Sequence, residues 1–346
     1  MHAGVDLGGT KIQVAIVDRD HNVRGTDRRL TPTVGTPDDV ADTIAASVEA
    51  AAKDAGITLD DICAAGVGSP GQIDLNAGTV SNAGNLPGWK TATYALGPQL
   101  SKRLGGIPVS IGNDVQVAVD AEVHLGAGRP YKSLLGVFLG TGVGGGVVFG
   151  DELWVGRGAA GEIGHTVVEA KGGAPCPCGR SGCLEAYAGR SAMEIQARKW
   201  HEAGKKTKLF KIMEEKGKTR LASGVWDKAL KKNDKMAKKL IDRAVWASGE
   251  AIGSAVNLLD VDAVVIGGGL GIRLGQPLAD RITEAMKPRL IKPNDAPPVL
   301  VAELGDLGGA IGASLLVSHL DERVGQKTPG AARNPQGTTK PIKGHH

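Results

Sequence analysis

The hydrophobic positions at the start of the chain alternate with small or polar ones, which is the period of a β-strand. Residues 5–7 and 12–16 form two such runs, and the turn Gly8-Gly9-Thr10 separates them. The pattern therefore predicts two strands joined by a tight glycine turn. Further short apolar runs predict strands over 23–30, 62–67, 108–111, 134–139, 147–149 and 261–266.

Helical patterns lie between these strands. Pro37 is followed by two aspartates, which suit the positive end of a helix dipole, and Gly56 ends the helix that this start predicts. Residues 191–260 have a mostly helical pattern, and glycines interrupt an apolar helical pattern after Leu304. Twice along the chain, a group of predicted strands is followed by a mixture of strands and helices. We therefore expect an α/β protein with two related lobes.

The composition is that of a globular protein. With 346 residues, 41% hydrophobic and 23% charged, the chain is long enough for two domains. It has no apolar run of about 18 residues, so we expect no membrane partner. Aromatic residues make up 3%, which disfavours a stacking surface for nucleic acid. Residues 198–243 carry 16 Lys and Arg against 6 Asp and Glu, which we interpret as a solvated helical surface rather than a nucleic-acid site.

The 52 glycines cluster in short runs, which is typical of turns where backbone approaches a ligand closely. Two stretches, 66–71 and 140–145, have the GxGxxG spacing of a dinucleotide site. That site also requires a helix directly after the loop, whereas here strand-like or turn-like residues follow both stretches. The chain contains no GxxxxGK[ST] motif either, so a P-loop is excluded.

A pair of β-hairpin turns is the remaining way to hold phosphates. Residues 6–11 and 140–146 occupy equivalent places in the two halves of the chain, and Gly267-Gly268-Gly269 follows another buried strand. Two facing turns can grip a nucleoside triphosphate through their backbone N–H groups. Asp6 would then hold Mg²⁺ through water, and Thr10 and Lys11 would contact phosphate oxygens. The alternative for each turn alone is an ordinary glycine turn.

The cysteines point to a metal. Four are too few for a disulfide scaffold in a chain of this length. Cys176, Cys178 and Cys183 lie within eight residues, and thiolates favour Zn²⁺, which takes four ligands in a structural site. The alternatives are a loop disulfide or free thiols. Cys63 lies in an apolar run, and we expect it in the core.

Together these motifs resemble the ROK family of sugar kinases and repressors, most of all its bacterial glucokinase branch. The resemblance covers residues 3–320 and rests on Asp6 to Lys11, Asn113-Asp114, the Gly140 to Gly146 run, Glu162-Ile163-Gly164-His165 and the cysteine cluster. It implies the actin-like (ribonuclease H-like) ATPase fold, an α/β fold with ATP and sugar bound in the cleft between two lobes.

The resemblance also implies a domain organisation. We expect a smaller α/β domain from residues 1–111 plus 305–323, and a larger one from residues 112–304 that holds the cysteine loop. Residues 324–346 are rich in Pro, Gly, Thr and Lys, and we expect them to form a disordered tail. Relatives of this kind form homodimers or homotetramers, and we expect the same here.

Asp114 has two interpretations. By type and position it is a helix N-cap. The resemblance instead aligns it with the family's catalytic base, which accepts the proton of the attacking sugar hydroxyl. At a helix N-terminus the dipole favours the anion, so we expect Asp114 to be ionised at neutral pH.

The resemblance assigns roles to further residues. The sugar-binding set is Asn113, Asp114, Glu162, His165, Glu185 and Gly71. The nucleotide-binding set is Asp6, Gly8, Gly9, Thr10, Lys11, Gly140, Thr141, Gly142, Gly268 and Gly269. His165 joins Cys176, Cys178 and Cys183 as the fourth ligand of a structural Zn²⁺, which would pin the loops that carry Glu162 and Glu185. Trp89 lies in a loop that in the family is near the sugar, where it either touches the sugar or anchors the loop.

The expected function is the ATP-dependent, Mg²⁺-dependent phosphorylation of D-glucose at its 6-hydroxyl, in the cytoplasm. A kinase for N-acetylmannosamine, N-acetylglucosamine, fructose or allose is the alternative, and polyphosphate is an alternative donor that relatives with the cysteine cluster usually do not use. A sugar-responsive repressor of the same family is disfavoured, because such repressors carry a helix-turn-helix ahead of the first phosphate motif, which here begins at Asp6.

Overall fold

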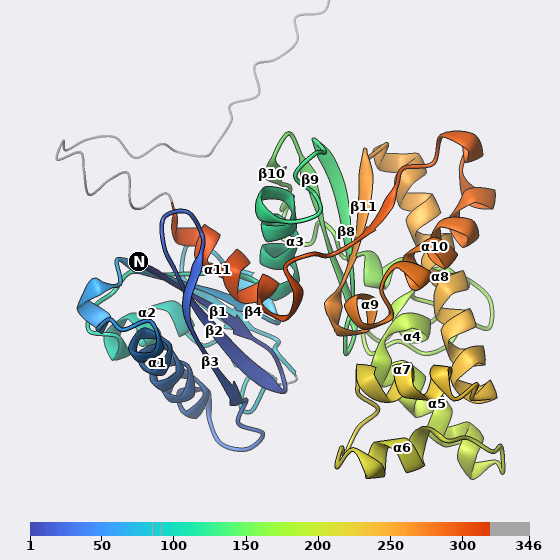
Figure 1. The fold of residues 1–346 in the computed structure, drawn as a ribbon, viewed down its shortest axis with the longest axis horizontal. Coiled ribbons are helices and arrows are strands. Elements are labelled where there is room, and N and C mark those ends of the chain that lie inside the picture. The colour runs from blue at the N-terminus through green and yellow to red at the C-terminus, as the bar shows by residue number, and fades with distance from the viewer. Residues whose placement is uncertain (85, 91, 319–346) are drawn as a thin grey trace, which may run out of the picture.

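The computed structural model describes residues 1–84, 86–90 and 92–318, and the predicted tail over 324–346 lies outside them. The chain folds into two lobes, each built on a five-stranded sheet (Figure 1). Each lobe has its own main cluster of buried apolar side chains. The two related lobes predicted from the alternation of strands and helices are therefore present.

The first sheet has the order β3-β2-β1-β4-β7. The pairs β1–β2 and β2–β3 are antiparallel, and β1–β4 and β4–β7 are parallel. Helix α1 packs on β2 and β3, whereas α11, from the end of the described chain, packs on β1 and β4. The bounds are β1 His2–Leu7, β2 Lys11–Val17, β3 Val23–Leu30, α1 Pro37–Asp54, β4 Ala64–Ser69, α2 Leu96–Arg103, β7 Val109–Asn113 and α11 Gly308–Ser318; a small hairpin, β5 Gln72–Asp74 and β6 Thr79–Ser81, lies between β4 and α2.

The second sheet repeats this order as β10-β9-β8-β11-β12. Here too an antiparallel meander comes first, and the next strands run parallel to it. Helix α3 packs on β9, and the long α8 packs with α10 in the outer helical layer (Figure 1). The bounds are α3 Asp114–Leu125, β8 Ser133–Leu139, β9 Val143–Phe149, β10 Glu152–Leu153, α4 Glu185–Ala188, α5 Arg190–Glu202, α6 Leu209–Glu215, α7 Ser223–Lys231, α8 Lys235–Leu259, β11 Ala263–Gly267, α9 Gly268–Leu274, α10 Gln276–Met286 and β12 Val299–Val301.

The strand predicted over 147–149 begins earlier than the apolar pattern indicated. β9 starts at Val143, so Gly144, Gly145 and Gly146 lie inside a strand paired with β8 rather than in a loop. The reason is packing, because a Cβ on Gly144 or Gly146 would lie within 3.2 Å of the valine side chains of α3. The glycine run therefore lets α3 rest directly on the sheet.

Cys63 is not in the core as predicted. It lies just before β4, its thiol is exposed, and its backbone N–H donates to the Met1 carbonyl. The apolar run that suggested a buried position begins to pair as a strand only at Ala64.

The basic segment forms the end of α5, all of α6 and α7, and the first part of α8, among the outer helices of the second lobe (Figure 1). Most of its lysines are exposed, including Lys199, Lys205 and Lys218, as the interpretation of a solvated helical surface requires. Over the described chain, no helix combines the length and the apolar character needed to span a bilayer.

Helices α3 and α11 cross between the two sheets and pack closely along their length. A Cβ on Gly312 of α11 would lie 1.9 Å from the carbonyl oxygen of Val117 in α3. Glycines of β1 and β4 face the other side of α11 equally closely, since a Cβ on Gly4 or Gly66 would lie 1.9 or 1.7 Å from its backbone oxygens. Small residues at this crossing therefore bring α3, α11 and the first sheet together.

This crossing predicts an unusual effect of alanine. Glycine to alanine in a helix interior ordinarily stabilises by up to about 1 kcal/mol. We expect Gly312→Ala to destabilise instead, by about 1–3 kcal/mol, because the added methyl group overlaps Val117. Urea denaturation measures the change. Gly224→Ala in α7 is the matched control, since a Cβ there would have one contact, 3.8 Å from the end of Lys216, and it should be neutral or stabilising. Equal effects of the two substitutions would contradict this account.

Candidate active site

A cleft of about 480 Å³ lies between the two lobes. It is lined by both glycine turns and by the start of α3. Of the residues predicted to bind sugar or nucleotide, those lining it are Asp6, Gly8, Gly9, Thr10, Lys11, Gly71, Asn113, Asp114, Gly140, Thr141, Gly142, Glu162, Glu185, Gly268 and Gly269. Segments far apart in sequence thus meet in one place, which is the arrangement the two-turn hypothesis requires.

The first turn joins β1 to β2 and is closed by the Gly8 N–H, which donates to the Lys11 carbonyl at 2.9 Å. The Thr31 hydroxyl donates to the Gly8 carbonyl at 2.6 Å. Asp6, at the end of β1, is covered by Gly309 of α11, where a Cβ would lie 2.9 Å from the carboxyl carbon. Burial raises the pKa of Asp6, and the Lys11 ammonium only partly offsets this.

The second turn joins β8 to β9 in the equivalent position of the other lobe. The Gly140 N–H donates to the Gly142 carbonyl at 2.9 Å, and a Glu185 carboxylate oxygen accepts from the Val143 N–H at 2.7 Å. Gly268, which opens α9, lies against this turn, since a Cβ there would be 2.7 Å from the Leu139 backbone. This β8–β9 turn, the large-lobe turn, is thus held by its own strands, by the Glu185 carboxylate and by the glycine run that opens α9.

Asn113, not Asp114, caps α3. The Asn113 side-chain oxygen accepts from the N–H groups of Val115 and Gln116 at 3.0 and 3.1 Å. One Asp114 carboxylate oxygen accepts from the Val115 N–H at 2.9 Å, and the other has no hydrogen bond to the described part of the chain. Because the neighbouring amide caps the helix, the aspartate keeps an oxygen for other chemistry, and the N-cap interpretation of Asp114 is wrong.

The expectation that Asp114 is fully ionised at neutral pH is also wrong. Burial in the cleft raises its pKa to about 7, and the nearby Asp6 and Glu162 carboxylates act in the same direction. The hydrogen bond from Val115 lowers the pKa but does not outweigh these effects. A carboxyl group that titrates near neutrality is well matched to accepting a proton in a reaction at that pH.

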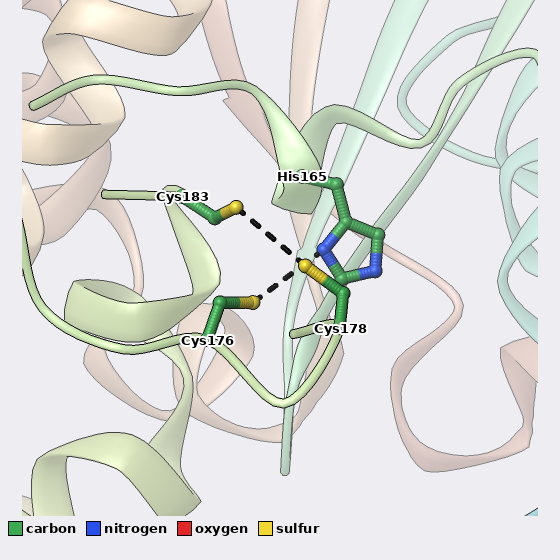
Figure 2. A group of neighbouring side chains, drawn as sticks. All are labelled: His165, Cys176, Cys178 and Cys183. Atoms are coloured by element: carbon green, nitrogen blue, oxygen red, sulfur yellow. Dashed lines mark hydrogen bonds between the residues drawn. The ribbon is translucent and has the colours of Figure 1, made fainter. Parts of the chain in front are cut away.

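Four side chains of the types that bind metals meet beside the cleft. The ligand atoms of His165, Cys176, Cys178 and Cys183 all lie within 4.8 Å of one another (Figure 2). The His165 Nδ1 is 3.7 Å from the Cys176 sulfur, and the Cys178 and Cys183 sulfurs are 3.8 Å apart, too far for a disulfide. Three soft thiolates and an imidazole are the donor set of a structural zinc site.

The metal-ligand group lies between the two segments that bring carboxylates to the cleft. The short helical turn Ile163–His165 directly follows Glu162, and the His165 N–H donates to the Glu162 carbonyl at 3.0 Å. A single residue, Leu184, separates Cys183 from the start of α4 at Glu185. His165, predicted for both sugar and metal, lines no part of the cleft, and its Nδ1 faces Cys176.

Three further charged residues line the cleft without having been predicted, namely Arg190, Glu122 and Asp306. Arg190 follows Gly189 and is the first residue of α5, five positions after Glu185. Glu122 is buried and its carboxylate accepts hydrogen bonds from three backbone N–H groups, those of residues 127, 303 and 304.

Trp89 is fully buried and stacks edge-on against Tyr94, so it anchors its loop.

The raised pKa of Asp114 predicts a pH-dependent stability. The unfolded carboxyl ionises near pH 3.8 and the folded one near pH 7, so the wild-type protein loses stability as the pH rises between these values. Asp114→Asn keeps the shape and cannot ionise. We expect its advantage over wild type to be larger at pH 8 than at pH 5, by on the order of 2–3 kcal/mol, in urea denaturation.

Asp151→Asn, at an exposed ion pair with Lys132, is the control for this comparison. Its effect on stability should differ little between the two pH values. A gain for Asp114→Asn that is the same at pH 5 and pH 8 would show that the carboxyl does not titrate near neutrality.

Comparison with known proteins agrees with the motifs. The ROK family model matches residues 2–319. A glucokinase from Thermotoga maritima is 32% identical over 327 residues, covering 93% of this chain and 98% of the relative. An N-acetylgalactosamine kinase from Shewanella is 31% identical, covering 93% and 98%.

Solved structures give the same relationship. A ROK family glucokinase from Streptomyces griseus, solved in complex with glucose and AMPPNP, superposes with a TM-score of 0.76 at 30% identity, covering 91% of this chain and 98% of that one. The two lobes have the actin-like ATPase fold of these kinases. The chain belongs to the ROK family.

Proposed function

We propose that this ROK sugar kinase transfers the γ-phosphoryl group of ATP to the 6-hydroxyl of D-glucose. The observation that carries the proposal is the single cleft in which two glycine turns, one from each lobe, flank the Asp114 carboxyl. Relatives named glucokinase at about 31% identity support glucose as the acceptor. The equally similar N-acetylgalactosamine kinase supports an N-acetylated hexosamine as the second candidate.

The turns supply the donor site. Residues 8–10 and 140–142 line the cleft from opposite lobes. The Gly8 and Gly140 N–H groups close the two turns, and the N–H groups of the residues that follow them suit a polyphosphate chain. Lys11 adds a positive charge on the small-lobe side. In-line transfer needs the donor and acceptor oxygens held on opposite sides of the phosphorus, and two turns on separate lobes can clamp the donor in this way.

The residues present fit Mg²⁺. Asp6 is a buried carboxylate whose pKa burial raises, and Asp306 is near enough to raise it further, so a divalent cation would relieve an unfavourable pair of anions. Oxygen ligands are those that Mg²⁺ prefers, with water completing its shell. We assign Asp6 as the residue that holds it; when bound, the ion neutralises charge on the transferring phosphoryl group.

Asp114 acts on the acceptor. Its free carboxylate oxygen accepts the proton of the 6-hydroxyl as the oxygen attacks the γ-phosphorus, and its pKa of about 7 permits this at neutral pH. The same cleft holds further groups that can bind the remaining sugar hydroxyls, namely Glu162, Glu185, the Asn113 amide and the backbone at Gly71.

Zinc in the Cys₃His group would have a structural role. Four protein ligands leave no open coordination position for chemistry. The ion would fix the segment after Glu162 and the segment before Glu185, and so the carboxylates that bind the sugar.

We place the protein in the cytoplasm, where ATP is available and thiolates stay reduced. We further propose domain boundaries near residues 111 and 305, and assembly into homodimers or homotetramers, as inferred from the family.

A coupled ADP-release assay across glucose, fructose, allose, N-acetylmannosamine, N-acetylgalactosamine and N-acetylglucosamine tests the function. We expect the highest kcat/KM for glucose, and a kcat about 10²–10⁴-fold lower for Asp114→Asn, with glucose binding retained. Asp151→Asn should match wild type. A higher kcat/KM for an N-acetylated sugar would replace glucose as the substrate. Wild-type turnover by Asp114→Asn would refute the role of the carboxyl.

Metal analysis tests the zinc site. We expect about one Zn²⁺ per purified chain, because the donor set is complete. Cys178→Ser should lose the ion and lower the melting temperature, since metal binding is coupled to folding of the loop. Cys63→Ser, at an exposed thiol outside the group, should retain both. Metal-free wild-type protein of full stability would rule the site out.

A further inference from the structure

Arg190, the first residue of α5, holds the large-lobe turn directly. Its Nε donates to the Gly140 carbonyl at 3.1 Å, and its Nη2 donates to the Thr141 hydroxyl at 3.2 Å. The backbone adds two more bonds, from the Arg190 and Ser191 N–H groups to the Gly140 and Thr141 carbonyls. The first N–H groups of α5 are therefore already used, and the guanidinium is what remains to face a ligand.

The guanidinium has spare donors and makes no ion pair with the described residues, although the Glu194 carboxylate is near enough to act on it. Two of its five N–H groups donate hydrogen bonds within the protein, and both acceptors are uncharged. Within the residues that the structure describes, Arg190 forms no ion pair. Its nearest charged neighbours include Arg220, whose Nη2 bonds to the adjacent Ser191 hydroxyl at 2.8 Å. Burial, and after it the charge of Arg220, lowers the pKa of Arg190, and the Glu194 carboxylate offsets this only in part. A bound anion would relieve both unfavourable effects.

The charge of the cleft makes this cation important. Among the described residues that line it, the side chains of Lys11 and Arg190 are the positively charged ones. The carboxylates facing them are Asp6, Asp114, Glu122, Glu162, Glu185 and Asp306. A nucleoside triphosphate carries several negative charges. On the large-lobe side of such an acidic cleft, a protonated arginine is the available group to bind it strongly.

We propose that Arg190 binds the phosphates of the nucleotide donor from the large lobe, as the counterpart of Lys11 on the small lobe. The inference rests on the proposed function, because it takes the donor to be a nucleoside triphosphate. The bonds to Gly140 and Thr141 fix the planar guanidinium, so its remaining N–H groups are presented with little loss of side-chain entropy. It is thus a donor-binding residue that also shapes the turn.

Arg190→Ala and Arg190→Lys test the proposal, with Lys199→Ala as the matched loss of an exposed positive charge on the same helix. For Arg190→Ala we expect the Kd for Mg²⁺-AMPPNP and the KM for ATP to rise about ten- to hundredfold, with the KM for glucose and the melting temperature close to wild type. Arg190→Lys should be intermediate, because a point charge replaces a fork. Added guanidinium should partly restore Arg190→Ala.

Two results would overturn the proposal. One is an unchanged Kd for Mg²⁺-AMPPNP in Arg190→Ala. The other is an equal loss of nucleotide and glucose affinity without rescue by guanidinium, which would show that the arginine only shapes the turn. The Kd for Mg²⁺-AMPPNP tests the role of Arg190 separately from the proposed sugar-kinase activity. A wild-type protein that binds AMPPNP through Arg190 and phosphorylates none of the sugars would refute the proposed function alone.

Discussion

The close crossing of α3 and α11 is the constraint on which the active site depends. Helix α3 begins with Asp114 and rests on the glycines of β9, while α11 covers Asp6 and lies against β1 and β4. Gly312 brings the two helices within a distance that any larger side chain would prevent. The Glu122 carboxylate then ties the far end of α3 to the backbone that leads into α11. One packed pair of helices thus sets where the aspartate lies relative to both turns.

The cleft is lined mainly by acidic side chains, yet the proposed ligand is a polyanion. The repulsion between the two accounts for much of the chemistry of the cleft. Burial raises the pKa values of Asp6 and Asp114, and a neighbouring carboxylate acts in the same direction on each, Asp306 on Asp6 and Asp6 on Asp114. For Asp114 this gives a proton acceptor that titrates near neutrality. For the donor site it means that cations must accompany the phosphates, either as side chains such as Arg190 or as a bound metal ion. Substrate binding and proton affinity are therefore two results of the same charge arrangement.

Much of the fold could be predicted because its signals are local. The turn between β1 and β2 and the start of α1 at Pro37 follow from alternation and capping over a few residues. The residues that meet in the cleft were recognisable by motif order. What could not be predicted depends on neighbours distant in sequence. The pKa of Asp114 requires knowing that Asp6 and Glu162 face it, and the role of Arg190 requires knowing that α5 begins beside the β8–β9 turn.

The position of α11 also has a consequence for how the protein is made. Strands β1 and β4 emerge early during synthesis, but the helix that covers their glycine face is encoded at residues 308–318. At about 5–20 residues per second, the ribosome needs on the order of 10–50 seconds to synthesise the chain between β4 and α11. During this delay the nascent first sheet has an uncovered face and is open to chaperones. Completion of the first lobe therefore waits for α11 to leave the exit tunnel.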